Sequence, residues 1–460
     1  MIAAPHSRAG KTTVATGLMA ALANRGLTVG AAKVGPDFID PSYHALATGR
    51  PARNLDAWIC GADAIVPLAA RAGAGADLLV VEGVMGLFDG AADSPVDAIQ
   101  VASTAQVAVL LDAPVVLVVD ASGLSSSVAA MVHGYATFDP AVRVAGVVLN
   151  RVGSHGHEAL LRQALEPLGL PVLGALRRDG AYAWRDRHLG LVPVVEQRSA
   201  VERSLGVLAA AIERHCDVEA LVALAHTAPA TSAGRLAAAS PSGRARVAVA
   251  AGDPFSFYYP DNLERLEETG AELVPFNPVT ESALPPSIDA LYAGGGFPEV
   301  FGESLAANTA LLADVRRRVG AGLVTWAECG GLLWLARSMD GRPMCAALPA
   351  EARMTDRLSL GYRRARVLVN TPLAPAGTQL LGHEFHYSAL HPAGDALAME
   401  GHLGCGISGF ASPTLLASYL HLHLGADPGP AERLVTLASQ SGAVLRQRSG
   451  SAVVQAVARR

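Results

Sequence analysis

A short phosphate-binding pattern near the start of the chain restricts its fold more than any other feature. Gly10-Lys11-Thr12-Thr13 overlaps the start of a helical pattern at 12–25. In such an arrangement the helix N-terminus and nearby N–H groups bind phosphate, the lysine reaches the outer phosphates and the first threonine hydroxyl binds Mg²⁺. Pro5 stands where the usual pattern has its first glycine, so we expect the amides around Ser7–Thr12 to form the cradle. The position before such a helix disfavours a chance match.

Apolar strand patterns alternate with helical patterns through the first half of the chain. This alternation predicts an α/β fold with a parallel, doubly wound sheet that binds ligands at the carboxyl ends of its strands. The β-branched runs are typical of strands buried on both faces. The predicted strands are 27–35, 76–82, 114–122 and 142–153, and the predicted helices are 61–73, 96–111, 123–136 and 155–168.

Acidic residues gather where these strands end. Carboxylates that face a phosphate-binding loop can hold Mg²⁺ between the phosphates of ATP. For any single one of these residues, a role as a turn residue or helix cap is as well supported as a role in metal binding. As a set at strand ends they favour a metal and nucleotide site, and the set is Asp37, Asp40, Glu82, Asp89 and Asp120.

A segment rich in Ala, Ser, Pro and Gly divides the chain. It has no apolar periodicity, which is typical of an exposed linker. A strand, a helix and a second strand follow it and predict another α/β domain with a doubly wound, mostly parallel sheet. The predicted division is a nucleotide-binding domain at 1–224, a linker at 225–244, a second domain at 245–447 and a tail at 448–460.

The second domain contains a pattern typical of a nucleophile elbow. An apolar strand pattern at 323–326 leads to Cys329, which is followed by Gly330-Gly331 and a helical pattern. A tight turn of this kind exposes the side chain at the end of a sheet, and the helix N-terminus behind it stabilises a thiolate or an oxyanion. The alternative is a buried structural cysteine, and the local pattern alone does not decide between the two.

Glycines and histidines around this cysteine support the catalytic interpretation. Gly294-Gly295-Gly296 ends a predicted strand, and its unobstructed amides are candidate oxyanion donors. Considered without the rest of the chain, the glycine triplet is more typical of a flexible turn. Strands are also predicted at 363–370, 379–388 and 412–425. The last contains His421 and His423, which share one face if the chain is extended.

A thiolate site needs a general base, and His421 is our candidate for Cys329. The predicted oxyanion donors are Gly295, Gly296 and Gly330. For each histidine the alternative is an ordinary surface or core side chain, and His383 and His386 are rival bases. A metal site built from the four histidines is disfavoured, because they lack a ligand-like spacing on one element.

Composition limits the remaining function classes. The 460 residues are 51% hydrophobic and 17% charged, which fits two or three domains with large cores. No apolar run is long enough to span a bilayer and no charged-then-apolar leader is seen, so a cytoplasmic protein is expected. The net charge of −5 gives no support for nucleic-acid binding. Five scattered cysteines argue against a disulfide framework and a structural zinc site.

The first half resembles the dethiobiotin-synthetase-like branch of phosphate-loop proteins, in segments 4–18, 32–41, 80–90 and 147–154. This resemblance implies an ATP site with Mg²⁺ held by Thr12, Asp40 and Glu82. It also implies ATP contacts from Ser7, Arg8, Ala9, Gly10, Lys11, Thr12 and Thr13, with Asn150 near the adenine. The phosphate and the substrate carboxylate would meet at Lys33, Asp37, Ile39, Asp40 and Asp89. Partitioning ATPases of this class carry a lysine where His6 stands here.

The second half resembles the class I glutamine amidotransferase domain, in the variant of the cobyric-acid-synthase group. The matching segments are 292–299, 327–335, 382–388 and 417–423. The usual domain ends its catalytic triad in His-x-Glu, and this chain has His421-Leu422-His423. The resemblance therefore implies a Cys–His dyad.

The two halves together resemble the cobyrinic/hydrogenobyrinic acid a,c-diamide synthase family. This resemblance implies glutamine, ATP and a corrin-ring polycarboxylate as partners, amidation of the a and c acetates through acyl phosphates, and ammonia transfer between the domains. Two alternatives are an amidoligase for another polycarboxylate and a switch ATPase with a non-catalytic second domain. The sequence leaves open the cobalt-bearing or cobalt-free ring, the order of amidation and a homodimer.

Overall fold

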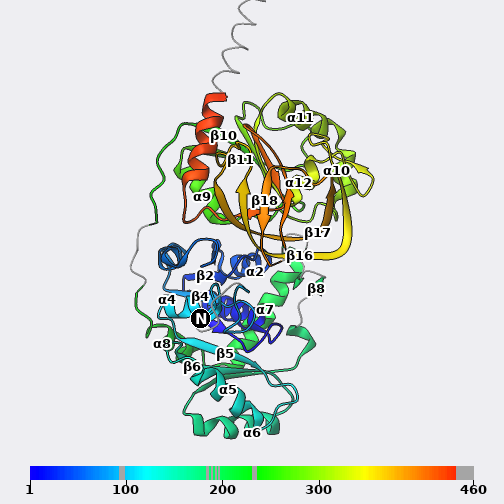
Figure 1. Ribbon diagram of the computed structural model, residues 1–460. Coiled ribbons are helices and arrows are strands. Elements are labelled where there is room, and N and C mark those ends of the chain that lie inside the picture. The colour runs from blue at the N-terminus through cyan, green and yellow to red at the C-terminus, as the bar shows by residue number, and fades with distance from the viewer. Residues whose placement is uncertain are drawn as a thin grey trace, which may run out of the picture. The chain divides into compact units, whose positions relative to one another are not determined.

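The computed structural model describes residues 1–92, 99–182, 186–187, 190–191, 194, 197–230, 236–402 and 404–441. The chain forms two compact units, Met1–Leu236 and Ala237–Arg460, whose elements are labelled in Figure 1. The predicted tail at 448–460 lies outside the described residues, as do the last residues of the predicted second domain (442–447) and 231–235 of the predicted linker. The first residue of the predicted linker, Ala225, ends a helix (Val218–Ala225), and the other described linker residues, 226–230 and 236–244, contain neither helix nor strand.

A seven-stranded parallel sheet forms the centre of the first unit. Its order is β3-β2-β4-β1-β5-β6-β7, and its pairings are parallel. The order reverses at β1, so the loop after β1 lies at the switch point where such sheets bind ligands. The strands are β1 (Ile2–Ala3), β2 (Val29–Val34), β3 (Ala52–Leu55), β4 (Leu78–Glu82), β5 (Val115–Asp120), β6 (Val144–Val152) and β7 (Val172–Arg177).

Helices connect these strands and cover the sheet. The first helix packs against α2 and α7, and α5 packs against α6 (Figure 1). Ser103 caps α4 by accepting the Gln106 N–H, so this helix begins at Thr104, later than predicted. The helices are α1 (Lys11–Asn24), α2 (Ile39–Thr48), α3 (Ile65–Gly73), α4 (Thr104–Leu110), α5 (Ser127–Thr137), α6 (His155–Leu165), α7 (Arg198–His215) and α8 (Val218–Ala225), with 3-10 turns η1 (Ala62–Ala64), η2 (Glu166–Leu168) and η3 (Gly180–Tyr182) and the short pair β8 (Asp186–Arg187) and β9 (Gly190–Leu191).

The second unit contains a six-stranded sheet of order β11-β10-β12-β13-β21-β20. Its pairings are parallel except that of β20 with β21. This confirms the predicted parallel α/β architecture, and the order again reverses at the unit's first strand. The strands are β10 (Ala245–Ala250), β11 (Ala271–Phe276), β12 (Ala290–Ala293), β13 (Val324–Glu328), β20 (Phe410–Ser412) and β21 (Leu415–Ser418).

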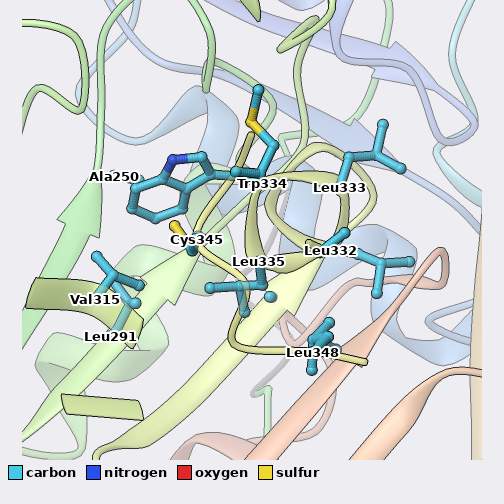
Figure 2. Close-up of a cluster of buried hydrophobic side chains, with 14 of the residues drawn as sticks. Ala250, Leu291, Val315, Leu332, Leu333, Trp334, Leu335, Cys345 and Leu348 are labelled. Carbon is cyan, nitrogen blue, oxygen red and sulfur yellow. The ribbon is translucent and has the colours of Figure 1, made fainter. Parts of the chain in front are cut away.

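The two faces of this sheet bury different side chains. Along β10, Ala248 and Ala250 belong to one apolar cluster and Val247 and Val249 to another, as the period of two in a strand requires. The first cluster includes α11 (Thr309–Gly320) and surrounds Trp334 of α12 (Gly330–Leu335), as Figure 2 shows. The second includes side chains of α9 (Pro260–Glu268) and of helical residues 429–441. Both faces are therefore covered.

A second, mostly antiparallel sheet extends this unit, and the sequence did not predict it. Its order is β15-β14-β16-β17-β22, with β18 and β19 attached to β16. The predicted strand 379–388 falls within β17, whereas the predicted strand 363–370 overlaps β16 only as far as Val367. The elements are α10 (Gly302–Ala307), β14 (Ser338–Met339), β15 (Arg342–Pro343), β16 (Glu351–Val367), β17 (Gln379–His391), β18 (Leu397–Glu400), β19 (Gly406–Ser408) and β22 (His421–Leu422).

The prediction of one continuous strand at 412–425 is wrong. Pro413 and Thr414 form a turn between β20 and β21, because proline has no N–H for a strand ladder. The chain then leaves the parallel sheet after Ser418, and β22 pairs with β17 of the antiparallel sheet instead. The two sheets therefore meet through the segment that carries His421.

Candidate active sites

The phosphate-binding loop of the first unit has the backbone that its sequence requires. Gly10 has a φ of 101°, a backbone angle that residues with a side chain rarely adopt. A Cβ at this position would also lie 2.0 Å from the Asn150 amide nitrogen. That nitrogen donates a 2.9 Å hydrogen bond to the carbonyl oxygen of Ala9. Asn150 therefore supports the underside of the loop, while Ser7 and Arg8 are exposed.

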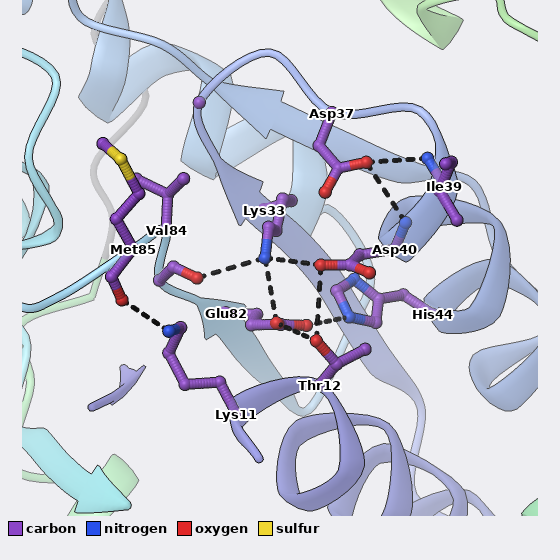
Figure 3. Close-up of polar contacts among 12 residues, drawn as sticks. Lys11, Thr12, Lys33, Asp37, Ile39, Asp40, His44, Glu82, Val84 and Met85 are labelled. Carbon is purple, nitrogen blue, oxygen red and sulfur yellow. Dashed lines mark hydrogen bonds and ion pairs between the residues drawn. The ribbon is translucent and has the colours of Figure 1, made fainter. Parts of the chain in front are cut away.

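Three predicted metal ligands meet beside this loop (Figure 3). The Thr12 hydroxyl donates to Glu82 Oε1 at 2.7 Å and lies 3.3 Å from Asp40 Oδ2. Lys33 Nζ lies among them and donates to Asp40 Oδ2 at 2.7 Å and to Glu82 Oε1 at 2.9 Å. The structure thus places the ends of β2 and β4 and the starts of α1 and α2 around one point.

Charge pairing decides the ionisation of this buried group. Burial by itself would lower the pKa of Lys33, but the carboxylates of Asp40 and Glu82 outweigh it and raise that pKa. Burial would raise the pKa of Glu82, but Lys33 and His44 outweigh it and hold that pKa far below its usual range. The lysine is therefore an ammonium and Glu82 a carboxylate in the folded chain.

The oxygen donors at this point suit Mg²⁺. A hydroxyl and two carboxylates are ligands that this ion prefers in nucleotide sites. Within the described ranges, no group of three or more His, Cys, Asp or Glu side chains is arranged to hold a metal ion. The hydroxyl of Thr12 and the carboxylates of Asp40 and Glu82 are a donor set that fits Mg²⁺, whose other ligands would come from phosphate and water.

Lys11 is folded back onto its own loop. Its ammonium donates to the carbonyl oxygens of Met85 and His6. Burial, reinforced by the charge of Lys33, lowers the pKa of Lys11 to about 8. A phosphate that binds to this ammonium therefore replaces backbone carbonyl contacts.

The remaining predicted phosphate and substrate residues shape the loops around the site. Asp37 Oδ1 accepts the N–H groups of Ile39 at 2.7 Å and Asp40 at 3.3 Å, which caps α2. Burial, with the nearby Asp40 charge, raises the pKa of Asp37 to about 8. Asp89 Oδ2 accepts the Gly86 N–H at 2.8 Å. Asp37 and Asp89 thus accept backbone N–H groups of their own loops. Such contacts are those of a helix cap or a turn residue, which was the alternative to metal or substrate binding for a single carboxylate.

Sequence reasoning missed His44. Its Nε2–H donates to Glu82 Oε2 at 2.6 Å, and both side chains are fully buried. The residue lies one helical turn after Asp40 in α2, a spacing that puts both on the same face. That spacing was the available signal, and it identifies His44 as the partner that fixes the orientation of Glu82.

In the second unit the elbow has the turned backbone that its pattern predicts, but Cys329 is buried, with 6% of its surface exposed, and not presented at the surface as expected. Cys329 has φ 45° and ψ −97° between the end of β13 and the start of α12. Its N–H donates to the Ser418 carbonyl oxygen at 2.8 Å. A Cβ at Gly331 would lie 2.1 Å from the Ala293 carbonyl oxygen, so only glycine fits there without movement.

The predicted oxyanion glycines lie beside this elbow. Strands β12 and β13 pair in parallel with Ala293 opposite Ala327, so 294–296 leave the sheet next to the cysteine. A Cβ at Gly330 would lie 3.1 Å from the Gly296 nitrogen. The Gly295 N–H donates to the Phe257 carbonyl oxygen at 3.3 Å, a long bond that competes with its proposed role as oxyanion donor.

The two candidate bases have different surroundings. A Cβ at Gly295 would lie 3.4 Å from His421 Nε2, so this ring adjoins the glycine loop. Its Nδ1 faces Glu328 Oε2 at 3.7 Å. His423 Nε2 instead faces Asp261 Oδ2 at 3.8 Å, away from those groups. The structure thus favours His421 over His423 as the base.

The rival histidines both stack on neighbouring rings, His383 buried and His386 half-buried. His383 stacks on His421 with ring centres 5.0 Å apart, and burial lowers its pKa well below the usual range. His386 stacks on Tyr419 at 3.6 Å and donates from Nδ1 to the Ser388 carbonyl oxygen at 2.9 Å. Burial lowers the pKa of His386 to about 4. Both rings are neutral near neutral pH.

The thiol of Cys329 is protonated at rest. Burial raises its pKa most, and the charges of Glu299 and Glu328 raise it further. A base must therefore take the thiol proton during attack.

Comparisons with known proteins match both units. Residues 1–191 match the CobQ/CobB/MinD/ParA nucleotide binding domain, and residues 246–429 match the CobB/CobQ-like glutamine amidotransferase domain. The hydrogenobyrinate a,c-diamide synthase of Streptomyces coelicolor is 47% identical over 95% of this chain and 96% of its own. The chain belongs to the a,c-diamide synthase family.

Relatives in this family carry two enzyme names. The enzyme of Mycobacterium tuberculosis H37Rv, a hydrogenobyrinate a,c-diamide synthase, is 45% identical, and the cobyrinate a,c-diamide synthase of Syntrophotalea carbinolica is 44% identical. Each alignment covers 95% of this chain and 97% of the relative. In the described part of the chain, no helix is long and apolar enough to cross a bilayer.

Proposed function

We propose that this chain amidates the a and c acetate carboxylates of cobyrinic acid or its cobalt-free counterpart, hydrogenobyrinic acid, using ATP and glutamine. The observation that carries this proposal is the membership of the whole chain in the a,c-diamide synthase family. The two candidate sites supply the two half-reactions that such an amidation needs.

The glutaminase half-reaction uses the elbow of the second unit. The Cys329 sulfur attacks the glutamine carboxamide carbon while the thiol proton passes to His421. The amides of Gly296 and Gly330, with Gly295, stabilise the oxyanion. His421 returns the proton to the leaving nitrogen, the C–N bond breaks and ammonia departs. Water then hydrolyses the glutamyl thioester to glutamate and restores the thiol.

The ligase half-reaction uses the loop of the first unit. A substrate carboxylate oxygen attacks the γ-phosphorus of ATP, which gives an acyl phosphate and ADP, and ammonia displaces the phosphate to form a primary amide. Thr12, Asp40 and Glu82 would hold Mg²⁺, which would offset the phosphate charge when bound. Lys11 and Lys33 do the same as ammonium groups. Loop residues Ser7–Thr13 bind the phosphates with Asn150 behind them, and Asp37, Ile39 and Asp89 border the substrate carboxylate.

The proposal extends to a cytoplasmic enzyme whose partners are small molecules. We also propose that it assembles as a homodimer. Light scattering tests this, because a mass near 47.3 kDa would show a monomer instead.

The decisive experiment incubates the protein with ATP, Mg²⁺, glutamine and each ring separately. Mass spectrometry should detect two successive amidations of one or both rings. The absence of any mass change with either ring would contradict the substrate. Cys329→Ala should abolish glutamine hydrolysis, and a variant that still hydrolyses glutamine would favour another site for that half-reaction.

A further inference from the structure

Glu328 is a buried carboxylate one residue before the nucleophile. It ends β13 and its side chain is 2% exposed. Oε1 accepts the Leu422 N–H at 2.9 Å, and Oε2 accepts the Tyr292 hydroxyl at 3.1 Å. The same Oε2 faces His421 Nδ1 at 3.7 Å. A buried carboxylate is costly unless donors surround it, and this one has two neutral donors and an imidazole.

The imidazole presents its other nitrogen to the elbow loop. A Cβ at Gly295 would lie 3.4 Å from His421 Nε2, and a Cβ at Gly330 would lie 3.3 Å from the Gly295 carbonyl carbon. One ring nitrogen thus faces Glu328 and the other faces the glycine loop beside Cys329. This is the order of parts in a nucleophile, base and carboxylate triad.

The residue at the sequence position of the usual triad carboxylate does not take that role. His423 faces Asp261, and its ring lies 4.5 Å from that of Tyr259. Its Nδ1 accepts the Gly425 N–H at 3.1 Å. These contacts direct His423 towards Asp261 and Tyr259 and not towards Cys329.

We propose that Glu328 is the positioning residue of His421, supplied from the nucleophile's own strand in place of the carboxylate that His-x-Glu would provide. It fixes the ring and stabilises the imidazolium that forms when His421 takes the Cys329 proton. The proton then leaves on ammonia. The 3.7 Å separation is longer than a hydrogen bond, and such pairs commonly shorten when substrate binds.

The surrounding charges fit this role. Glu299, Glu328 and Glu384 all raise the pKa of the Cys329 thiol after burial has done so. The resting thiol is therefore neutral. The proton moves only when the glutamine carbonyl takes up charge, and at that moment Glu328 favours the imidazolium.

The test rests on the proposed glutaminase function and separates the two half-reactions. In Glu328→Gln we expect the glutamine-dependent kcat to fall by at least about 100-fold, with KM for glutamine changed less than about threefold. Amidation driven by added ammonium salt should remain within about twofold of wild type, because it does not need the thiol. The acidic limb of the kcat/KM profile for glutamine should move to lower pH, because a negative charge near an imidazole raises its pKa.

Matched variants distinguish this role from general packing. Tyr292→Phe removes a donor from the same oxygen and should leave the glutamine-dependent kcat within about threefold. Glu328→Asp keeps the negative charge but moves it away from His421. Its glutamine-dependent kcat should fall by about tenfold, which is less than in Glu328→Gln. The proposal would be overturned if Glu328→Gln kept the wild-type glutamine-dependent kcat and the wild-type acidic limb of the kcat/KM profile.

If Glu328→Gln also loses ammonia-driven amidation, the fold is damaged and Glu328→Asp decides. Unchanged glutamine-dependent kcat in Glu328→Asp would then overturn the proposal. Wild-type protein that does not hydrolyse glutamine would instead refute the proposed function itself.

Discussion

At the residue scale, the reactivity of Cys329 depends on its burial. A thiolate reacts with alkylating agents and a thiol does not, and the raised pKa of Cys329 keeps it protonated. We predict that iodoacetamide labels Cys329 at least about tenfold more slowly than the exposed Cys405 at neutral pH. Peptide mapping by mass spectrometry measures both rates in one sample. Faster labelling of Cys329 would show a thiolate in the resting enzyme.

His386 makes the second unit sensitive to acid. Its pKa falls from 6.5 in the unfolded chain to about 4 in the folded one, because of burial. The unfolded state therefore binds the proton first, and stability is lost as pH falls from 6.5 towards 4, by up to about 3 kcal/mol.

We predict that His386→Asn, whose amide replaces the Nδ1 donor, flattens this dependence. Hydrogen exchange of the β17 peptides at pH 7.5 and pH 5 gives the measurement. His402→Asn at an exposed site is the control and should keep the wild-type slope. An equally steep slope in His386→Asn would assign the acid sensitivity to other groups.

His44 should control metal affinity without touching nucleotide. Its ring fixes one oxygen of Glu82 while the other faces Thr12 and Lys33. Loss of such an outer partner typically weakens metal binding by about 10- to 100-fold, and we predict this for His44→Gln. Titration calorimetry of Mg²⁺ into the ATP-loaded protein measures it. Thr48→Ala, one turn further along α2, is the control, and equal Mg²⁺ affinities in all three proteins would contradict the assignment.

Individual residues were predicted where a local pattern carries them. Thr12, Lys11 and Cys329 stand in motifs that can be read from a few neighbours. Glu328 was missed as the partner of His421 because 93 residues separate them in sequence, and only the pairing of β13 and β21 and the turn into β22 bring them together.

At the element scale, the elbow depends on a glycine beneath it. A side chain at Gly331 would meet the β12 backbone at the Ala293 carbonyl oxygen, which cannot rotate away. We predict that Gly331→Ala lowers stability by about 1–3 kcal/mol and removes glutamine hydrolysis, because the elbow must move. Gly320 ends α11 and has open space around it. Gly320→Ala is therefore the control, and its stability and glutamine hydrolysis should match those of wild type. Urea denaturation and a glutaminase assay measure both variants.

Elements were predicted where apolar runs are long. Strands β2, β4, β5 and β6 follow such runs, and the structure confirms them. The missed β1 and β3 are only two and four residues long. The missed β7 has six residues, as β2 and β5 do, but it lies at a sheet edge, as β3 does. The antiparallel sheet was missed because strand patterns do not tell which partner a strand pairs with.

At the scale of the whole molecule, the proposed function requires that ammonia made in one unit is consumed in the other. Tethering sets the effective concentration of such an exchange, which falls with linker length. We predict that a flexible insertion of about 20 residues between Ala238 and Ala239 slows glutamine-driven amidation about tenfold and leaves glutamine hydrolysis unchanged. Amidation with added ammonium salt is the control and should not change. Full coupling in the lengthened protein would contradict a tethered exchange.

The peptide bond between Glu328 and Cys329 has a consequence for engineering. The nucleophile and the carboxylate assigned to its base share one strand end, so their spacing is a covalent length and does not depend on packing between distant segments. Grafting this four-residue turn, Glu328 to Gly331, into another parallel sheet would carry both groups at once. Only a histidine from a neighbouring strand would then remain to be supplied.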